Sequence, residues 1–299
     1  MVNIFTENFF LAGKSKNFLK GIFGVEARGP KGVFRSLADG LKILGVPFVV
    51  NQPINSPVSA ACILSDARVL KWAIRQKEKG MVKKLVVGPN VVVTPNDYDN
   101  LIQHSAIDLI VEPSEWVKDL YIQLAPALSH KLVVWAAGVK MPSTTGEKTC
   151  DFVVLNKMPN RGLLNKILQH LENNRLSFKL LEYGTFDQKR YFSLLEKSKY
   201  LIYLSNSESQ GLALAEAWAH NVPSFVFESG RYDSHGARVK GKVSAPYLNT
   251  ETGMSFKDYS EFLVGLEEFM QKNFSPRKYV EENLTDAICA KKYLNLINA

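Results

Sequence analysis

One short segment, Ser205–Trp218 (SNSESQGLALAEAW), concentrates polar residues of a kind that binds ligands. An apolar run, Tyr200–Leu204, precedes the segment, and a helical stretch begins near Gly211. The first amides of a helix have no intrahelical partner and carry partial positive charge, which favours a bound phosphate. Gly211 has no Cβ, so the backbone there can approach a ligand closely. The segment therefore predicts an anion site at a helix N-terminus.

Two carboxylates belong to this segment. Glu208 is in the predicted loop, and Glu216 is more than one turn into the predicted helix, among Leu214, Ala215 and Trp218. We expect the two acids to contact two parts of one extended ligand rather than to act as a close pair. Spacing alone leaves a structural alternative open, in which Glu208 belongs to the cap region and Glu216 is solvated.

The elements that position these residues follow a repeated pattern in which short apolar runs alternate with amphipathic helical segments. This pattern predicts an α/β fold with doubly wound parallel sheets. Strands are expected at Val2–Phe5, Pro47–Val50, Leu85–Val87, Ile107–Val111, Lys131–Trp135, Asp151–Leu155, Ser177–Leu181, Tyr200–Leu204 and Ser224–Phe227. Helices are expected at Gly32–Leu44, Asp66–Lys79, Asn96–Gln103, Ser114–Leu124, Gly162–Asn173, Asp187–Ser198, Gly211–His220, Asp258–Lys272 and Pro276–Ile297. Ligands of such folds bind outside the carboxyl ends of the strands.

Composition excludes several classes of protein. The 299 residues are 46% hydrophobic and 22% charged, which excludes disorder, collagen and coiled coil for the whole chain. Cys62, Cys150 and Cys289 are too few and too scattered for a disulfide framework or a zinc site. No other metal-ligand spacing is present, so no metal site is predicted.

Charge and hydropathy bear on partners and location. The chain carries 37 Lys+Arg against 29 Asp+Glu, a formal charge of +8, which suggests an anionic partner. The basic residues are spread along the chain rather than clustered, so nucleic acid is not the expected partner. The N-terminal sequence does not have the pattern of a secretory signal, and no run is apolar enough to span a membrane. We expect a cytoplasmic protein.

The Glu-x7-Glu spacing of Glu208 and Glu216, followed by Ala217–Pro223, resembles the retaining glycosyltransferases of GT-B fold, in their group 1 or family 4-like type. The chain departs from the family pattern at Ser209, Gln210 and Asn221. Other segments resemble the family in the same order along the chain: Gly29–Arg35, Val111–Val117, Ala137–Val139, Ser244–Tyr247 and Thr252–Phe256.

The resemblance implies roles for individual residues. Glu216 would bind the ribose hydroxyls of a nucleotide sugar, and Glu208 would contact the donor sugar near its reacting end. The amides of Gly211 and Leu212 would hold the diphosphate, and the departures at Ser209 and Gln210 change the loop near the sugar.

Basic residues after the strand that opens the C-terminal domain would complete the donor site. Lys157 and Arg161 stand there, and cations beside a leaving diphosphate stabilise its developing charge. Ordinary solvated surface charge is the alternative for both. Gly32 is a weaker candidate, since it either lets the backbone approach the diphosphate or acceptor or merely opens a helix. GT-B enzymes generally need no metal ion.

The resemblance also implies a domain arrangement of two facing Rossmann-like domains. Residues 1–128 would form the acceptor side, and residues 129–275 would bind the nucleotide sugar. A final helix, 276–299, would pack back on the first domain. The polar loop Gly138–Thr149 marks the boundary region, with strand Lys131–Trp135 assigned to the second domain.

The function that follows is transfer of a sugar, with retention, from a UDP- or GDP-sugar to a hydroxyl of a glycan, polysaccharide or lipid-linked acceptor. No cofactor is required. The excess positive charge suggests peripheral association with an anionic membrane surface. The alternative is a non-catalytic nucleotide-sugar-binding or partner subunit on the same fold.

Overall fold

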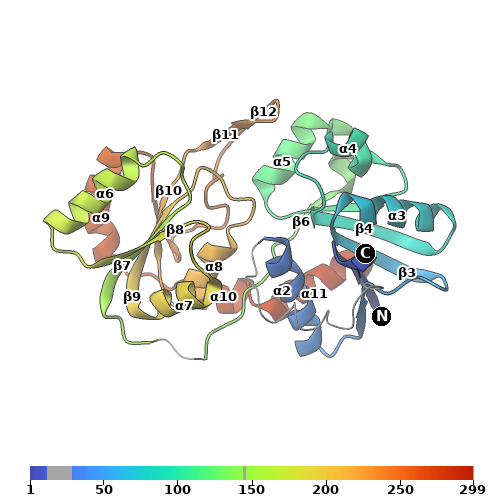
Figure 1. Cartoon of the computed structure of the whole chain (residues 1–299), viewed down its shortest axis with the longest axis horizontal. Coiled ribbons are helices and arrows are strands. Elements are labelled where there is room, and N and C mark those ends of the chain that lie inside the picture. The colour runs from blue at the N-terminus through green and yellow to red at the C-terminus, as the bar shows by residue number, and fades with distance from the viewer. Residues whose placement is uncertain (12–28, 144–145, 299) are drawn as a thin grey trace. The chain divides into compact units, whose positions relative to one another are not determined.

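The computed structural model describes residues 1–11, 29–143 and 146–298, which form two compact units, each with its own parallel sheet (Figure 1). The first unit contains Met1–Gly138, Ser234–Ala237 and Asp286–Ala299. The second contains Val139–Asp233 and Arg238–Thr285. The predicted fold class, two α/β parts built on parallel sheets, is confirmed.

The sheet of the first unit has six parallel strands in the order β2-β1-β3-β4-β5-β6. Residues 60–64 and 85–87 are buried along the chain without alternation. Such continuous burial is typical of parallel strands that are covered on both faces. The strands are β1 (Val2–Phe5), β2 (Phe48–Val50), β3 (Val58–Ser65), β4 (Val82–Asn90), β5 (Leu109–Glu112) and β6 (Leu132–Val134).

Helices α2 and α11 pack closely in the first unit. A Cβ added at Gly40 of α2 would lie 2.1 Å from the Asp286 carbonyl oxygen and 2.6 Å from Ala290 Cβ of α11. Glycine therefore permits this contact. The helical elements of the unit are η1 (Phe9–Leu11), α2 (Pro30–Ile43), α3 (Ala67–Glu78), α4 (Asp97–Asn100), η2 (Leu101–Gln103), α5 (Glu115–Leu124), η3 (Pro126–Lys131) and α11 (Asp286–Asn298).

The second unit has a five-stranded parallel sheet in the order β13-β10-β9-β7-β8, and a separate strand pair, β11-β12. Aromatic side chains fill much of its core, where Phe225 stacks on Phe269 with ring centroids 5.0 Å apart. The strands are β7 (Cys150–Asn156), β8 (Phe178–Glu182), β9 (Ser198–Leu204), β10 (Ser224–Phe227), β11 (Arg231–Ser234), β12 (Ala237–Lys240) and β13 (Gly253–Phe256). The helices are α6 (Gly162–Asn173), α7 (Gln188–Lys197), α8 (Leu212–Ala219), α9 (Tyr259–Gln271) and α10 (Pro276–Asn283).

Strand β6 lies in the first unit, whereas the predicted domain boundary assigned it to the second. It pairs in parallel with β5, with Ile110 opposite Leu132, and so belongs to the sheet of the first unit. The first unit continues to Gly138. The polar loop predicted as the boundary region begins there, and its residues 144–145 lie outside the described residues.

The C-terminal helix is two helices rather than one. The chain leaves helical geometry at Leu284, whose carbonyl oxygen accepts from the Val139 amide at 2.8 Å, and Thr285 forms a bridge with Val139. Only α11 belongs to the first unit, where it packs on α2, whereas α10 packs on α8 in the second unit.

The stretch predicted as helix Asn96–Gln103 also differs. Tyr98, Asp99 and Asn100 all have left-handed backbone geometry, with φ of 53°, 59° and 59°. The Asp97 carboxylate accepts from the amides of Val93 and Thr94 at 2.9 and 2.8 Å and so closes the loop that precedes this turn. Among the described helices, none has the length and apolar character needed to cross a membrane.

Candidate functional site

The junction between β9 and α8 has the geometry that the sequence predicts. Residues 201–204 of β9 are buried, residues 205–211 form a loop, and α8 begins at Leu212. Gly211 is the N-cap, with φ of 83°, a backbone region that glycine adopts at little cost. The amides of Leu214 and Ala215 donate to the Gly211 carbonyl oxygen, whereas the two amides before them, of Leu212 and Ala213, have no acceptor within the helix and are suited to bind an anion.

Glu208 lies at the centre of a hydrogen-bonded cluster in this loop. Its Oε1 accepts from Lys157 Nζ at 2.5 Å, from Tyr203 Oη at 2.7 Å and from Ser205 Oγ at 2.9 Å. The Glu208 side chain is 13% exposed. Burial, followed by the charge of Glu208, raises the pKa of the Tyr203 hydroxyl well above its usual value, so Tyr203 remains a donor.

Lys157 is brought to Glu208 by the pairing of two strands. It follows β7 directly, and its amide donates to the Leu204 carbonyl oxygen at the end of β9 at 2.8 Å. Its Nζ lies 4.6 Å from the centroid of the Tyr183 ring. The side chain is only 20% exposed, so its charge acts where water screens little. The structure thus brings Lys157 and Glu208, two residues predicted to be catalytic, into contact.

Arg161 is held by a different carboxylate. Its Nη1 lies 2.8 Å from Glu182 Oε1, and Asn156 Nδ2 donates to the other oxygen of Glu182 at 2.9 Å. Arg161 is 56% exposed, so this pair is weaker than the pair of Lys157 and Glu208.

Glu216 lies in the second turn of α8, on a different element from Glu208. Gln188, the first residue of α7, donates from Nε2 to Glu216 Oε1. Tyr191, also on α7, donates to the Ala213 carbonyl oxygen at 2.8 Å and ties α7 to the start of α8. Burial raises the pKa of Tyr191 well above its usual value, and the negative charge of Glu216 adds to the effect.

Three residues of this region were not predicted from the sequence as site residues, namely Glu182, Tyr183 and Gln188. Glu182 ends β8 and Tyr183 follows it, so both stand at the carboxyl end of a parallel strand. The rule that ligands bind at such ends could have found them. Gln188 opens a helix, and nothing in its neighbourhood along the chain indicates that it reaches Glu216.

Comparison with solved structures places this arrangement in a known fold. Sucrose-phosphate synthase from Thermosynechococcus elongatus matches 100% of this chain and 98% of its own, with a TM-score of 0.60 and 10% identity. The lipopolysaccharide outer core galactosyltransferase WaaB matches 89% of this chain and 79% of its own, with a TM-score of 0.57 and 13% identity. The fold is that of the GT-B glycosyltransferases.

Other structures with this GT-B fold contain nucleotides. The catalytic domain of starch synthase IV from Arabidopsis thaliana, bound to ADP and acarbose, matches 90% of this chain and 76% of its own, with a TM-score of 0.53 and 12% identity. Some similar chains are longer, and the match spans 60% of a chain of the GtfA/B complex and 58% of S. aureus TarM. No protein-family model and no curated protein matches the sequence.

The remaining predicted residues divide between the two units of the GT-B fold. Ser209 is exposed beside Glu208, Leu212 is half-buried at the start of α8, and the Gln210 side chain is 6% exposed. Gly32 is in the first unit, buried in the first turn of α2, where its amide donates to the Gly29 carbonyl oxygen at 2.9 Å. Within the described residues, no group of three His, Cys, Asp or Glu side chains is placed to hold a metal ion.

Proposed function

We propose that this chain is a glycosyltransferase that moves a sugar from a nucleotide diphosphate sugar to an acceptor hydroxyl with retention of configuration. The pair of Lys157 and Glu208 beside the N-terminus of α8 carries the proposal. A cation, a carboxylate and the first amides of α8 thus lie together at the carboxyl end of one parallel sheet. The similar folds of starch synthase IV, bound to ADP, and of TarM, in complex with UDP, support it.

The second unit would hold the donor. The amides at Gly211 and Leu212 bind the diphosphate, and Glu216 accepts hydrogen bonds from the ribose hydroxyls in place of Gln188. Glu208 accepts from a hydroxyl of the donor sugar. Lys157 and Arg161 neutralise charge on the leaving diphosphate, Arg161 with a planar group that can bind two oxygens at once.

The reaction exchanges one bond at the anomeric carbon of the donor sugar. The bond from this carbon to the diphosphate oxygen breaks, and a bond to the acceptor oxygen forms on the same face. The proton of the acceptor hydroxyl passes to the departing diphosphate. Negative charge grows on the diphosphate as the bond breaks. Lys157 and the α8 amides therefore interact more strongly with the transition state than with the donor before reaction.

Incubation of the full chain with UDP-, GDP- and ADP-sugars and a mixture of glycan acceptors tests the proposal. We expect one donor to give a new glycoside whose anomeric configuration, determined by NMR, equals that of the donor. An inverted product contradicts retention. If a nucleotide sugar binds but is neither transferred nor hydrolysed, the chain is a non-catalytic partner subunit, and the proposal is wrong.

The acceptor is a glycan, polysaccharide or lipid-linked sugar in this proposal, and the net charge of +8 would favour an anionic membrane surface. Sedimentation with vesicles tests the membrane contact. We expect more protein to bind vesicles with acidic lipid than neutral vesicles at low salt, and equal binding contradicts the contact.

A further inference from the structure

A second buried carboxylate, Glu228, lies at the carboxyl end of the sheet that carries Glu208. It follows β10 directly and is 8% exposed. Among the described residues, no cation forms an ion pair with Glu228. Taking a carboxylate out of water is costly unless other groups stabilise its charge. The groups that surround Glu228 therefore indicate what it does in the fold.

Three backbone amides stabilise this charge, and they come from both sides of the β11-β12 strand pair. Glu228 Oε1 accepts from the amide of Gly230, before the strand pair, at 3.0 Å and from that of Val243, after it, at 3.2 Å. The Ser244 amide donates to both oxygens, at 3.2 and 3.1 Å. Hydrogen bonds to an ionised acceptor are stronger than those between neutral groups. Glu228 thus closes the base of the strand pair and fixes residues 243–244 at the end of β10.

Residues 243–244 are bonded in turn to the loop that carries Glu208. The Val243 carbonyl oxygen accepts from the Glu208 amide at 2.8 Å. The hydroxyl of Ser244, a residue that is 0% exposed, donates to the Asn206 carbonyl oxygen at 3.1 Å. The Glu228 carboxylate therefore fixes the backbone of the Glu208 loop through one intervening peptide segment.

The side-chain cluster of Glu208 needs this support. Three donors, Lys157 Nζ and the hydroxyls of Tyr203 and Ser205, converge on its single oxygen Oε1. Hydrogen bonds weaken steeply when donor and acceptor are misaligned, so a shift of the loop backbone would weaken all three together. Residues that contact a ligand are held in place by a surrounding layer of hydrogen bonds, and Glu228 supplies such bonds here.

We propose that Glu228 is a positioning residue, which holds the loop of residues 206–208 so that the Glu208 carboxylate is in place for the donor sugar. That Glu208 contacts this sugar rests on the proposed function. The ribose and the diphosphate would contact α8, whose residues form no hydrogen bond with Glu228. Loss of Glu228 should therefore lower turnover and leave the binding of a free nucleotide unchanged.

Hydrogen–deuterium exchange and steady-state kinetics of the full chain test Glu228→Ala and the milder Glu228→Gln, which keeps one acceptor oxygen. We expect peptides that cover residues 205–210 and 242–246 to exchange about tenfold faster in Glu228→Ala, because the bonds that oppose local opening are lost. Turnover should fall about tenfold to a hundredfold, as a misplacement of about 1 Å in a contacting group causes. Glu228→Gln should show smaller changes in both, and UDP, GDP and ADP should bind both variants like the wild type.

The matched control is Asp258→Ala, which also removes a carboxylate that accepts from a backbone amide. Asp258 is exposed at the start of α9, where it accepts from the Glu261 amide at 2.9 Å. Loss of this helix cap should lower the stability of the second unit. Turnover and the exchange of residues 205–210 should stay those of the wild type, since Asp258 does not bond the Glu208 loop.

Three results would overturn the proposal: unchanged exchange of residues 205–210 in Glu228→Ala, turnover equal to that of Asp258→Ala, or an equal loss of turnover and nucleotide affinity. Glu228→Gln is judged by the same criteria if the alanine variant does not fold. The exchange measurement needs no donor sugar, so it separates this proposal from the proposed function. Faster loop exchange in the variant, with no transfer by the wild type, contradicts the proposed function alone. Transfer by the wild type, with unchanged loop exchange in the variant, contradicts the role of Glu228 alone.

Discussion

The two parallel sheets of this protein present different chemistry at equivalent places, the carboxyl ends of their strands. In the second unit, cations meet carboxylates in Lys157–Glu208, at 2.5 Å, and Arg161–Glu182, at 2.8 Å. In the first unit, Glu7 accepts a hydrogen bond from the hydroxyl of Ser65, and the cation Arg68, which pairs with Asp66, is 73% exposed. Under the proposed function, the cations of the second unit would bind the charged diphosphate, whereas this edge of the first sheet carries a carboxylate paired with a hydroxyl.

The difference shows what a repeated architecture does and does not decide. Parallel β-α units place loops and helix N-termini at one edge of each sheet, so they determine where a ligand binds. The side chains on those loops determine which ligand binds. Four predictions test this division of roles, and they are ordered here from the largest expected effect to the smallest.

Lys157→Ala should lower turnover by about a hundredfold to a thousandfold, because a half-buried cation beside the leaving diphosphate is lost. Steady-state kinetics with the preferred donor measures this effect. Lys166→Ala is the matched control, since Lys166 is on α6 and its Nζ lies 5.7 Å from the Tyr259 ring instead. Equal turnover in the two variants would contradict the assignment of diphosphate chemistry to Lys157.

Gly40→Ala should destabilise the first unit by about 1–3 kcal/mol, because the added Cβ would overlap the backbone oxygen of Asp286. Urea unfolding followed by circular dichroism measures the loss. Gly265→Ala in the second unit is the comparison, since its Cβ would meet the Phe225 ring at 3.0 Å, and a side chain can move. If Gly265→Ala costs more, α2 and α11 are not in close contact.

Arg161→Ala should lower turnover by about tenfold, less than Lys157→Ala, because Arg161 is 56% exposed and water screens its charge. The ratio of the two losses of turnover compares how much Lys157 and Arg161 contribute to the reaction. A larger loss for Arg161 than for Lys157 would mean that Arg161 leaves Glu182 and becomes the main contact of the diphosphate.

Glu112→Gln should stabilise the protein at neutral pH by about 1 kcal/mol or more. Burial raises the pKa of Glu112 well above its usual value of 4.5, so the folded state keeps a proton that the unfolded state releases. Stability from this group is present below pH 4.5 and is lost as pH rises toward the folded-state pKa. Glutamine has no proton to lose, so the variant should lack this decline in unfolding experiments across pH.

The control for Glu112→Gln is Glu115→Gln, which removes one negative charge from a side chain that is 72% exposed. The same gain in both variants would mean that net charge, rather than burial of Glu112, causes the effect. Glu112 also extends the comparison of the two units. It is the last residue of β5 and is 2% exposed, and no cation forms an ion pair with it among the residues that the structure describes.

Much of the fold could be predicted because it is local. Continuous apolar runs and helical periodicity revealed most strands and helices, and the junction at Gly211 was recognised from a strand, a glycine and a helix. Strand β3 of the first sheet and strand β13 of the second were not predicted. The position of β6 could not be predicted, since its pairing with β5 depends on contacts between residues about twenty positions apart. The left-handed turn at residues 98–100 was missed because a helical sequence pattern does not show where single residues take positive φ.

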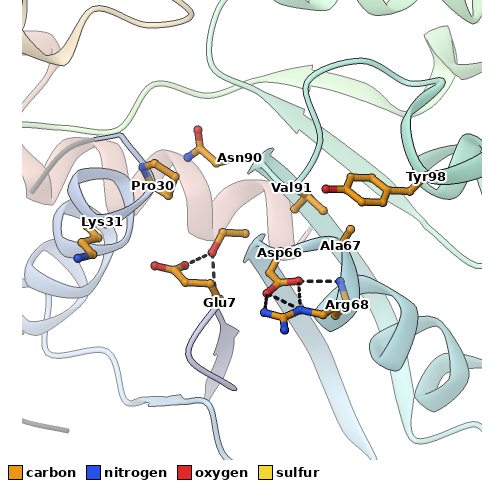
Figure 2. A pocket seen from close by; sticks show the side chains of 10 residues that line it. Glu7, Pro30, Lys31, Asp66, Ala67, Arg68, Asn90, Val91 and Tyr98 are labelled. Carbon is orange, nitrogen blue, oxygen red and sulfur yellow. Dashed lines mark hydrogen bonds and ion pairs between the residues drawn. The ribbon is translucent and has the colours of Figure 1, made fainter. Parts of the chain in front are cut away.

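The candidate site was predicted in part for the same reason. Glu208, Lys157 and Glu216 could be selected as candidates from the sequence, since each follows a strand or lies near a recognisable helix start; their roles stay predictions. Tyr203, which donates to Glu208, Gln188, which donates to Glu216, and Glu182, which pairs with Arg161, come from strands and helices that meet only in the folded unit. In the first unit, Glu7, Asp66, Asn90 and Tyr98 line one pocket from four separate segments (Figure 2), and no spacing along the chain reveals it.

Calorimetric titration of UDP, GDP and ADP into the wild-type chain and the Glu216→Ala variant tests the central claim most directly. We predict that one diphosphate binds the wild type and that the variant binds it about tenfold to a hundredfold more weakly, since ribose hydrogen bonds to a carboxylate are lost. Glu172→Ala, an exposed carboxylate on α6, should bind like the wild type. Full nucleotide affinity in Glu216→Ala, or no binding of any of the three to the wild type, would contradict a nucleotide-sugar site in the second unit.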